Sequence, residues 1–319
     1  MQHPIAIAIL DDYQNVALRS ADWSVLGDVD FRVFNDGPVD RDLLVERLAP
    51  CAVICAMRER TVLDRALIAR LPNLRLIVST GQRNVAIDVK AAQEKGIIVC
   101  STGGSSSAAP ELTWALLMAA ARRLPAEFAA MRAGRWQTTI GRDLEGATLA
   151  LLGLGGIGGA MARYGKAFGM AVIAWSENLD EARATAAGAK RVTKDDLFRN
   201  GDFVSIHLRL SPRTRGLVDA RALSMMKPDA ILINTSRGAI VDEAALIETL
   251  RSRRIGGAAL DTFEVEPLPK DHPFRTLDNV VATGHVGYVT EGSYRLYFGD
   301  TVENIRAWMD GRPIRVMAG

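Results

Sequence analysis

Short apolar segments rich in β-branched residues alternate with amphipathic helical patterns along the whole chain of 319 residues. Strands are expected at residues 5–10, 31–34, 52–56, 74–78 and 97–100, and then at 148–152, 171–175, 203–206, 230–234, 257–260 and 280–282. Helices are expected at residues 40–48, 64–71, 88–95, 110–131, 161–168 and 291–310. Such alternation is typical of parallel sheets joined by crossover helices.

The alternation is interrupted once, at residues 101–107, which are all small or polar. This segment is a candidate hinge, because small polar residues favour loops. A length of 319 residues corresponds to about two domains of ordinary size. The chain is therefore expected to form two α/β units, with the second starting near residue 105.

The composition excludes several classes of protein. Hydrophobic residues make up 48% and charged residues 24%, which is typical of a globular protein rather than a disordered one. The net charge of +2 gives no reason to expect nucleic acid or an anionic membrane as a partner. We expect no targeting segment and no membrane span, because the charge-free stretch 146–162 is short and contains six glycines.

Three cysteines are spread over the first third of the chain, at Cys51, Cys55 and Cys100. An odd and scattered set does not form a disulfide framework. They are expected to be small core residues, with a metal or redox role for Cys51 and Cys55 as the weaker alternative. Reduced core thiols suit a cytoplasmic location, and no metal site is predicted.

A glycine-rich turn follows the strand expected at 148–152. It contains Gly153, Gly155, Gly156, Ile157 and Gly158 in a G-x-G-x-x-G pattern. A helix and a second strand follow, so the context is that of a dinucleotide-binding unit. In this motif the glycines allow a tight turn, close approach of a pyrophosphate and close helix packing, and the helix N-terminus attracts the anion. A turn without a ligand is the alternative.

The choice between the two nicotinamide cofactors depends on the end of the second strand. Ser176 and Glu177 stand there, and Glu177 would bind the ribose hydroxyls and repel a 2′-phosphate. This favours NAD. NADP stays open, because Ser176 accepts either cofactor and Arg183 is a candidate phosphate ligand.

Three charged residues follow three strands of the second half. These residues are Arg237, Glu266 and His285, and in an open α/β sheet ligands bind at the carboxyl ends of strands. A histidine beside a carboxylate holds a proton, and a guanidinium grips a carboxylate and polarises a neighbouring carbonyl. With a nicotinamide as hydride donor, this set would reduce a 2-oxo acid. Taken singly, each residue also fits a structural role as core histidine, surface ion pair or helix cap.

Several motifs in order resemble the D-isomer-specific 2-hydroxyacid dehydrogenase family. They are the segments LEGATLALLGLGGIG (144–158), FGMAV (168–172), VSIH (204–207) with Thr214, NTSRGAIVD (234–242), ALDTFEVEP (259–267) and GHVG (284–287). In the first half, STGQRN (79–84) followed by Ile87 and Asp88 is similar to a further loop of the family. The resemblance covers nearly the whole chain.

The resemblance implies a fold of two Rossmann-like doubly wound domains with a cleft between them. A flavodoxin-like substrate domain would comprise residues 1–103 and 288–319, and an NAD(P)-binding Rossmann domain residues 104–287. It implies that Arg237 binds the substrate carboxylate and carbonyl, and that His285 is the acid and base, paired with Glu266. Gly81, Gln82 and Arg83 would hold the substrate carboxylate. The cofactor would also contact His207, Thr235 and Asp261.

The implied function is hydride transfer between NAD, or NADP, and a small 2-oxo or D-2-hydroxy acid. Glyoxylate, hydroxypyruvate, phosphoglycerate-like and bulkier acids remain open as substrates. The family also implies a homodimer. The alternative is a dinucleotide-sensing, corepressor-like binding protein on the same fold, since fold does not fix function. A formate- or phosphite-type enzyme is a narrower option, and Glu266 counts against the formate type.

Some residues depart from the family pattern or keep two interpretations. Ser176 replaces the usual aspartate, and residues 209–212 replace the usual Pro-Leu. Arg58 and Arg60 are interpreted as surface charges, or alternatively as cations selecting an anionic substrate tail. Trp136 is expected in the core, a dimer contact or a lid, and His272 is expected to be solvated.

Overall fold

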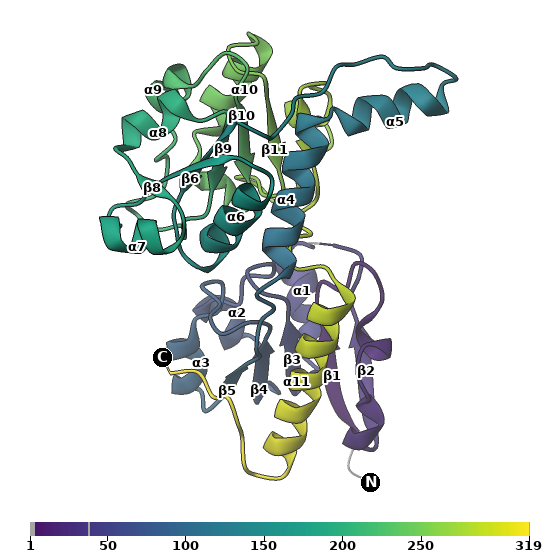
Figure 1. The fold of residues 1–319 in the computed structure, drawn as a ribbon. Helices are drawn as coiled ribbons and strands as arrows, with labels where there is room; N and C mark the ends of the chain where they lie inside the picture. Colours follow the sequence, from purple (N-terminus) through teal and green to yellow (C-terminus); the bar gives the residue numbers. More distant parts are fainter. Residues whose placement is uncertain (1–3, 38, 319) are drawn as a thin grey trace. The chain divides into compact units, whose positions relative to one another are not determined.

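The computed structural model describes residues 4–37 and 39–318. The chain divides into two compact units, one formed by the described parts of 1–105 and 289–319 and the other by 106–288. The first unit is thus built from two separate stretches of chain (Figure 1). Each unit contains one parallel sheet with helices on its faces, so the predicted class, two doubly wound α/β units, is confirmed.

The sheet of the first unit has five strands in the order β2-β1-β3-β4-β5. Their bounds are β1 (Ile5–Ile9), β2 (Val29–Val33), β3 (Val53–Ala56), β4 (Leu76–Ser79) and β5 (Ile98–Ser101). All pairs are parallel. This order is that of a flavodoxin-like sheet, as predicted.

The three short helices of the first unit begin at aspartates. Asp40, Asp64 and Asp88 accept hydrogen bonds from backbone N–H groups of the first turns of α1 (Arg41–Leu48), α2 (Arg65–Ala69) and α3 (Val89–Glu94). These N–H groups have no partner within the helix, so the carboxylates satisfy them. The expected caps are confirmed. Two 3₁₀ turns precede α1, namely η1 (Ala17–Arg19) and η2 (Trp23–Leu26).

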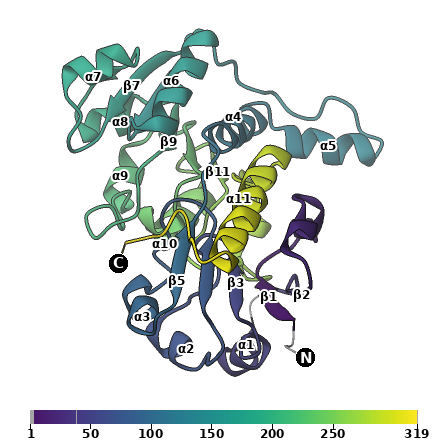
Figure 2. The ribbon, with the colours of Figure 1, turned by 90° about the horizontal axis from the view of Figure 1, so that it is seen from below.

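The last helix, α11 (Glu291–Met309), returns to the first unit and packs on β4 and η2 (Figure 2). The Asn304 side chain donates to the carbonyl of Ser101 at 2.9 Å. Further along, the N–H of Met317 donates to the carbonyl of Val99 at 2.8 Å. The C-terminal stretch is therefore tied to the edge strand β5.

The sheet of the second unit has seven strands in the order β12-β11-β10-β9-β6-β7-β8. This is the order of a Rossmann sheet with one strand added at the β12 edge. The bounds are β6 (Thr148–Leu152), β7 (Ala171–Trp175), β8 (Lys190–Arg191), β9 (Phe203–Ile206), β10 (Ile231–Asn234), β11 (Gly257–Leu260) and β12 (Val280–Ala282). The sequence did not predict β8, a two-residue exposed edge strand.

Strand β6 shows how the second sheet is buried on both faces. Leu149 and Leu151 belong to one core cluster, with residues of α4 (Ala108–Ala121) and α6 (Gly156–Ala167), whereas Ala150 and Leu152 belong to another. Successive side chains of a strand point to opposite faces, so both faces need a covering layer. The remaining helices of this unit are α5 (Leu124–Arg132), α7 (Glu181–Ala186), α8 (Lys194–Asn200), α9 (Ala220–Met225), α10 (Glu243–Arg251), η3 (Gly238–Ile240) and η4 (Pro273–Arg275).

The single helix expected over 110–131 is wrong, because α4 ends at Ala121 and α5 begins at Leu124. Pro125 explains the break, since proline has no N–H and its ring excludes the carbonyl four residues earlier. The carbonyl of Ala121 instead accepts the N–H of Arg142 at 2.8 Å. Arg123 adopts a left-handed conformation between the helices, and α5 extends away from the sheet of its unit (Figure 1).

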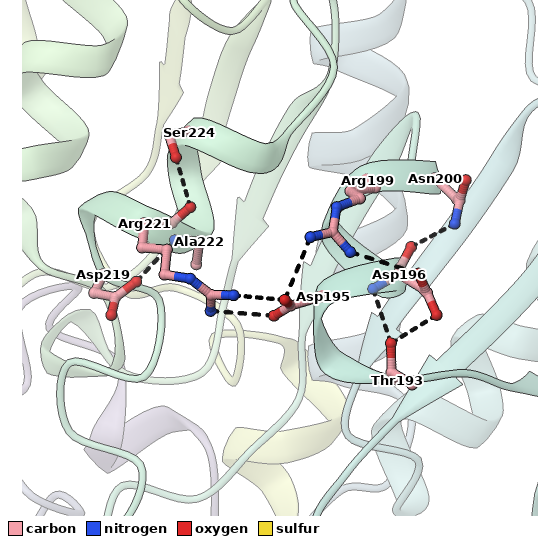
Figure 3. A network of polar contacts seen from close by, with 9 residues as sticks. All are labelled: Thr193, Asp195, Asp196, Arg199, Asn200, Asp219, Arg221, Ala222 and Ser224. Carbon is pink, nitrogen blue, oxygen red and sulfur yellow. Dashed lines mark hydrogen bonds and ion pairs between the residues drawn. The ribbon is translucent and has the colours of Figure 1, made fainter.

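Helices α8 and α9 are joined on the surface by one ion pair, which a second arginine, from α8, extends. Both terminal nitrogens of Arg221 contact the carboxylate of Asp195, at 2.6 and 3.2 Å, and Arg199 contacts the same carboxylate at 3.4 Å (Figure 3). Arg221 holds the pKa of Asp195 below its usual range. Exposed ion pairs of this kind contribute little to stability. The packing of apolar residues therefore stabilises the layer of helices α8 and α9.

Cys51, Cys55 and Cys100 are free and buried, as predicted. Burial raises the pKa of the Cys55 thiol, and it raises that of Cys100 to about 11. Both thiols are therefore held in the unreactive protonated form. In the part of the chain that the structure describes, no helix is long and apolar enough to cross a membrane.

Candidate active site

The polar residues singled out in the second half follow neighbouring strands. Arg237 follows β10, Glu266 follows β11 and His285 follows β12, and these three strands lie side by side in the sheet. All three run parallel, so their carboxyl ends meet at one edge. This is the edge at which α/β sheets bind ligands.

His285 and Glu266 form a close pair. The distance between His285 Nδ1 and Glu266 Oε2 is 2.6 Å, and the two side chains are about one-fifth exposed (19% and 22%). The other carboxylate oxygen of Glu266 accepts the N–H of Phe263 at 3.0 Å. The carboxylate is thus fixed at both oxygens, and with Nδ1 directed at it, Nε2 is the ring nitrogen suited to proton exchange with a substrate.

The backbone at His285 is left-handed, with φ of 55°. A non-glycine residue in this region stores strain that its surroundings must hold. Asp261 does so, since its carboxylate accepts the N–H groups of Val286 at 2.8 Å and Gly287 at 2.9 Å, and the hydroxyl of Thr283 at 2.6 Å. The Asp261 carboxylate therefore forms hydrogen bonds with the turn both before and after His285.

Asp261 is 1% exposed, and these three bonds give it a structural role in the His285 turn. Its expected contact with the nicotinamide side of the cofactor stays a prediction.

Arg237 lies between β10 and η3, in a turn fixed by Asn234. The side chain of Asn234 donates to the carbonyl of Arg237 at 2.9 Å and accepts the N–H of Ser236 at 3.0 Å. Gly238 follows, and a Cβ there would lie 2.0 Å from the carbonyl carbon of Phe263. Only glycine fits this contact, so the backbone that bears Arg237 packs directly on the loop that bears Glu266.

The glycine-rich turn has the geometry of an open cradle. Gly153 has φ of 105°, and its Cβ would lie 2.6 Å from the carbonyl oxygen of His207; a Cβ at Gly158 would lie 2.2 Å from the carbonyl oxygen of Gly153. These two glycines are required by the packing. At Gly155 and Gly156, in contrast, no atom lies within 4 Å of a Cβ position, so a ligand has room to approach the backbone.

Helix α6 begins at Gly156, earlier than the expected start at residue 161. The expectation was wrong because glycine is a poor helix former, yet here glycines make up the first turn. Its N-cap, Gly155, supplies no side-chain hydrogen bond, whereas α7 to α10 all have an Asp or Thr cap. The first N–H groups of α6 thus fit a phosphate, which supports the predicted cofactor site.

The residues expected near the adenosine ribose lie at the end of β7. Ser176 is half-buried and Glu177 is exposed. The guanidinium of Arg183 donates to the carbonyl of Asn178 at 3.3 Å, so this cation lies beside the same turn. Both a carboxylate and a guanidinium are therefore available at this edge.

His207 and Thr235 are half-buried residues of the second unit. His207 Nε2 is 2.9 Å from the hydroxyl of Ser205, and its Nδ1 is buried without a hydrogen-bond partner among the described residues. Burial lowers the pKa of His207 to about 3, so it is neutral and unsuited to proton donation. The hydroxyl of Thr235 lies 2.7 Å from that of Thr113, linking it to α4.

Hydrogen bonds hold the loop at residues 79–84 of the first unit in place. The N–H of Gly81 donates to the hydroxyl of Thr102 at 2.8 Å, which leaves Gln82 and Arg83 as the exposed members of the predicted carboxylate site. The side chain of Arg58 lies against Gly81 and also pairs with Glu59 at 3.4 Å. Arg58 thus combines the two interpretations, a surface ion pair and a cation beside the loop.

The expectation that His272 is solvated is wrong, because its side chain is 13% exposed and its Nε2 lies 3.1 Å from Oε1 of Glu243. Of the three interpretations of Trp136, the core position is excluded, because the residue is 73% exposed in the segment after α5. A dimer contact and a lid stay predictions for Trp136. Sequence reasoning also missed Glu243, for which the only signal was its place directly after the cap residue Asp242.

Residues 114–287 match the family model described as D-isomer specific 2-hydroxyacid dehydrogenase, NAD binding domain. The chain is 37% identical over 275 residues to D-3-phosphoglycerate dehydrogenase from Methanocaldococcus jannaschii, covering 85% of this chain and 52% of that protein. It is 38% identical over 260 residues to glyoxylate reductase from Aeropyrum pernix, covering 78% of each. The chain thus spans about half the length of the phosphoglycerate dehydrogenase it matches.

Among solved structures, the chain is similar to a putative D-3-phosphoglycerate dehydrogenase oxidoreductase from Ralstonia solanacearum. The TM-score is 0.92 at 39% identity, covering 98% of this chain and 96% of the other. The likeness therefore extends over both units, beyond the part matched by the family model.

Proposed function

Because the chain belongs to the D-isomer specific 2-hydroxyacid dehydrogenase family, we propose that it transfers a hydride between a nicotinamide cofactor and a small 2-oxo or D-2-hydroxy acid. The family expected from the motifs is confirmed. The observation that carries the proposed activity is the 2.6 Å pair of His285 and Glu266 at the strand edge that also presents Arg237.

Each residue has a distinct task in this proposal. Arg237 binds the substrate carboxylate and polarises the adjacent carbonyl. His285 gives a proton to the carbonyl oxygen during reduction and takes it back during oxidation, while Glu266 stabilises the imidazolium. The backbone N–H groups of Gln82 and Arg83, two exposed residues of the first unit, would bind a carboxylate.

The cofactor, when bound, supplies the hydride. The open backbone at Gly155 and Gly156 and the uncapped start of α6 fit its pyrophosphate. Gly153, Ile157 and Gly158 complete this loop, and we assign Ser176 and Glu177 to the adenosine ribose. His207, Thr235 and Asp261 remain proposed contacts on the same unit.

We propose NAD rather than NADP as the preferred cofactor, because Glu177 would repel a 2′-phosphate. Arg183 works in the opposite sense. Glu177→Gln should therefore bring the dissociation constants for NADH and NADPH closer together, and Arg183→Ala should weaken NADPH binding more than NADH binding. Arg163→Ala, an exposed arginine on α6, is the control, and equal effects on both cofactors would refute the assignment.

The substrate class depends on the cations near the first-unit loop. Arg58 lies against Gly81, and Arg83 is exposed in the same loop. Among the relatives, one is named for phosphoglycerate and one for glyoxylate. We propose that a substrate with a second anionic group is preferred, with Arg58 as its ligand.

The activity is tested with NADH and NADPH oxidation against a panel of 2-oxo acids with and without a phosphate or sulfonate. Turnover that is lost in Arg237→Ala supports the dehydrogenase. Tight NADH binding without turnover of any acid would instead favour a dinucleotide-sensing protein. A preference for anionic substrates that survives Arg58→Ala would refute the role of Arg58.

We also propose that the protein is a cytoplasmic homodimer formed through the segment that follows α4. Phe128, Trp136 and Ile140 are 58%, 73% and 90% exposed in this segment, which extends away from its unit (Figure 1). Large apolar side chains so exposed mark interaction surfaces. The test is light scattering, in which Trp136→Ala combined with Ile140→Ser should yield a monomer.

A further inference from the structure

The second unit contains a second histidine–glutamate pair, formed by His272 and Glu243, which contacts the loop that carries Glu266. The distance from His272 Nε2 to Glu243 Oε1 is 3.1 Å, and the side chains are only 13% and 18% exposed. Neither residue belongs to the proposed reaction. Burying a carboxylate costs free energy unless its oxygens are hydrogen-bonded. The partners of both oxygens of Glu243 therefore indicate what the residue does.

The other carboxylate oxygen of Glu243 contacts the protein backbone. It accepts the backbone N–H of Glu264 at 3.2 Å, in the loop between β11 and Glu266. The side chain of Glu264 lies 4.0 Å from Arg215, in an exposed ion pair. Glu243 therefore binds the backbone of the loop that carries Glu266.

The hydrogen bonds of His272 also define the tautomer of its ring. Its Nδ1 accepts the N–H of Phe274 at 3.3 Å, at the start of η4. The proton of a neutral ring is then on Nε2, which donates to Glu243. The ring also contacts Phe274, with ring centroids 4.8 Å apart, and Phe274 lies 6.2 Å from Phe263.

These contacts lead to the catalytic pair in two steps. Phe263, packed on Phe274, donates its N–H to Oε1 of Glu266, and Oε2 of Glu266 faces His285. The loop is bounded on its other side by Gly238, whose packing on Phe263 leaves no space for a side chain. A shift of residues 263 and 264 would thus move the carboxylate away from the imidazole.

We infer that Glu243 and His272 are positioning residues, which hold the 261–267 loop so that Glu266 stays in register with His285. This inference rests on the proposed function for its effect on turnover. Its structural part, the fixing of the loop, does not.

The first test measures the loop directly. Hydrogen–deuterium exchange of peptides covering 261–267 should become faster in Glu243→Gln and in His272→Asn. Asparagine retains an acceptor for the N–H of Phe274 but is too short to reach Glu243, so it separates the cap from the pair. Glu248→Gln, an exposed residue of the same helix, is the matched control. Unchanged exchange in both variants would overturn the inference, even if the protein shows no turnover.

The second test measures coupling to the catalytic pair. Glu243→Gln should lower kcat about tenfold while the dissociation constant for NADH stays within twofold, because misplacement of a catalytic group affects mainly the chemical step. In a Glu266→Gln background the same change should cost less than about twofold, since residues acting through one group are not additive. Additive losses would assign the pair a merely structural role. An inactive wild-type protein would refute the proposed function but leave the exchange result decisive for the loop.

Discussion

The second unit contains two histidine–glutamate pairs that are alike in composition and differ in surroundings. His285 faces Glu266 at 2.6 Å, whereas His272 faces Glu243 at 3.1 Å. His285 has a left-handed backbone in a turn that Asp261 holds, but His272 has an extended backbone and caps a 3₁₀ turn.

The difference lies in what each ring nitrogen contacts. In His272 both nitrogens are used inside the protein, one as acceptor from Phe274 and one as donor to Glu243. In His285 the nitrogen Nδ1 contacts Glu266, and the ring is presented at the edge of the sheet where ligands bind. A histidine–carboxylate pair therefore indicates proton transfer by its place at the ligand-binding edge of the sheet, and not by its composition alone.

The largest expected effect separates the two histidines by activity. His285→Asn should lower kcat about 100- to 10,000-fold, the range for loss of a general acid and base. His272→Asn should lower kcat only about tenfold. Steady-state kinetics with the preferred substrate would check this, and equal losses in the two variants would show that the two histidines do not differ in their role.

The next effect concerns the contact that joins Arg237 to the loop between the pairs. Gly238→Ala places a Cβ 2.0 Å from backbone of Phe263, so the loop must shift. We expect a loss of about 3 kcal/mol in the free energy of unfolding, at the upper end for overpacking. Denaturant unfolding would measure it. Gly299→Ala, where a Cβ meets no atom within 4 Å, is the control and should leave stability unimpaired.

A smaller effect is expected at the carboxylate that supports only one of the pairs. Asp261→Asn replaces one acceptor by a donor facing the His285 turn, which should cost about 2 kcal/mol because a buried N–H loses its partner. Exchange of the amides of Val286 and Gly287 should become faster, with the 263–264 amides unaffected. Equal changes in both segments would show that the two pairs are one cooperative unit.

A still smaller effect involves His207, which has no carboxylate partner among the residues that the structure describes. Burial lowers its pKa to about 3 in the folded protein, from the ordinary histidine value of about 6.5. Below pH 6.5 the unfolded chain binds a proton that the folded chain excludes, so this contribution to stability is complete above pH 6.5 and decreases as the pH falls toward 3. Relative to His207→Gln, the wild type should lose about 1 kcal/mol between pH 6.5 and 5.5. Parallel pH dependence of the two proteins would contradict this.

Much of the fold could be predicted, because neighbouring residues in the sequence indicate where most strands and several helices begin. Aspartates before apolar helical patterns defined the starts of α1, α2 and α3, and short β-rich runs defined all strands except β8. The break before α5 had a local signal as well, Pro125, which the prediction overlooked. The start of α6 had none, because glycines form a helical turn there only through their packing.

The candidate site was predictable only in part. Arg237, Glu266 and His285 stand out because each follows a strand and carries a charge suited to the chemistry. The role of Asp261 in the His285 turn and the link from Glu243 to His272 depend on contacts between residues that are 25 and 29 positions apart. Such contacts are set by tertiary packing, and no pattern in the chain indicates them.

The order of synthesis gives the discontinuous first unit a particular history. Its sheet is complete at Ser101, yet the helix that packs on β4 starts only at Glu291, after the entire second unit. At about 5–20 residues per second, a ribosome needs about 10–40 s to translate the chain in between. The second unit is therefore able to close while the first still lacks its last layer, and a nascent chain arrested before α11 would expose an apolar sheet face to chaperones.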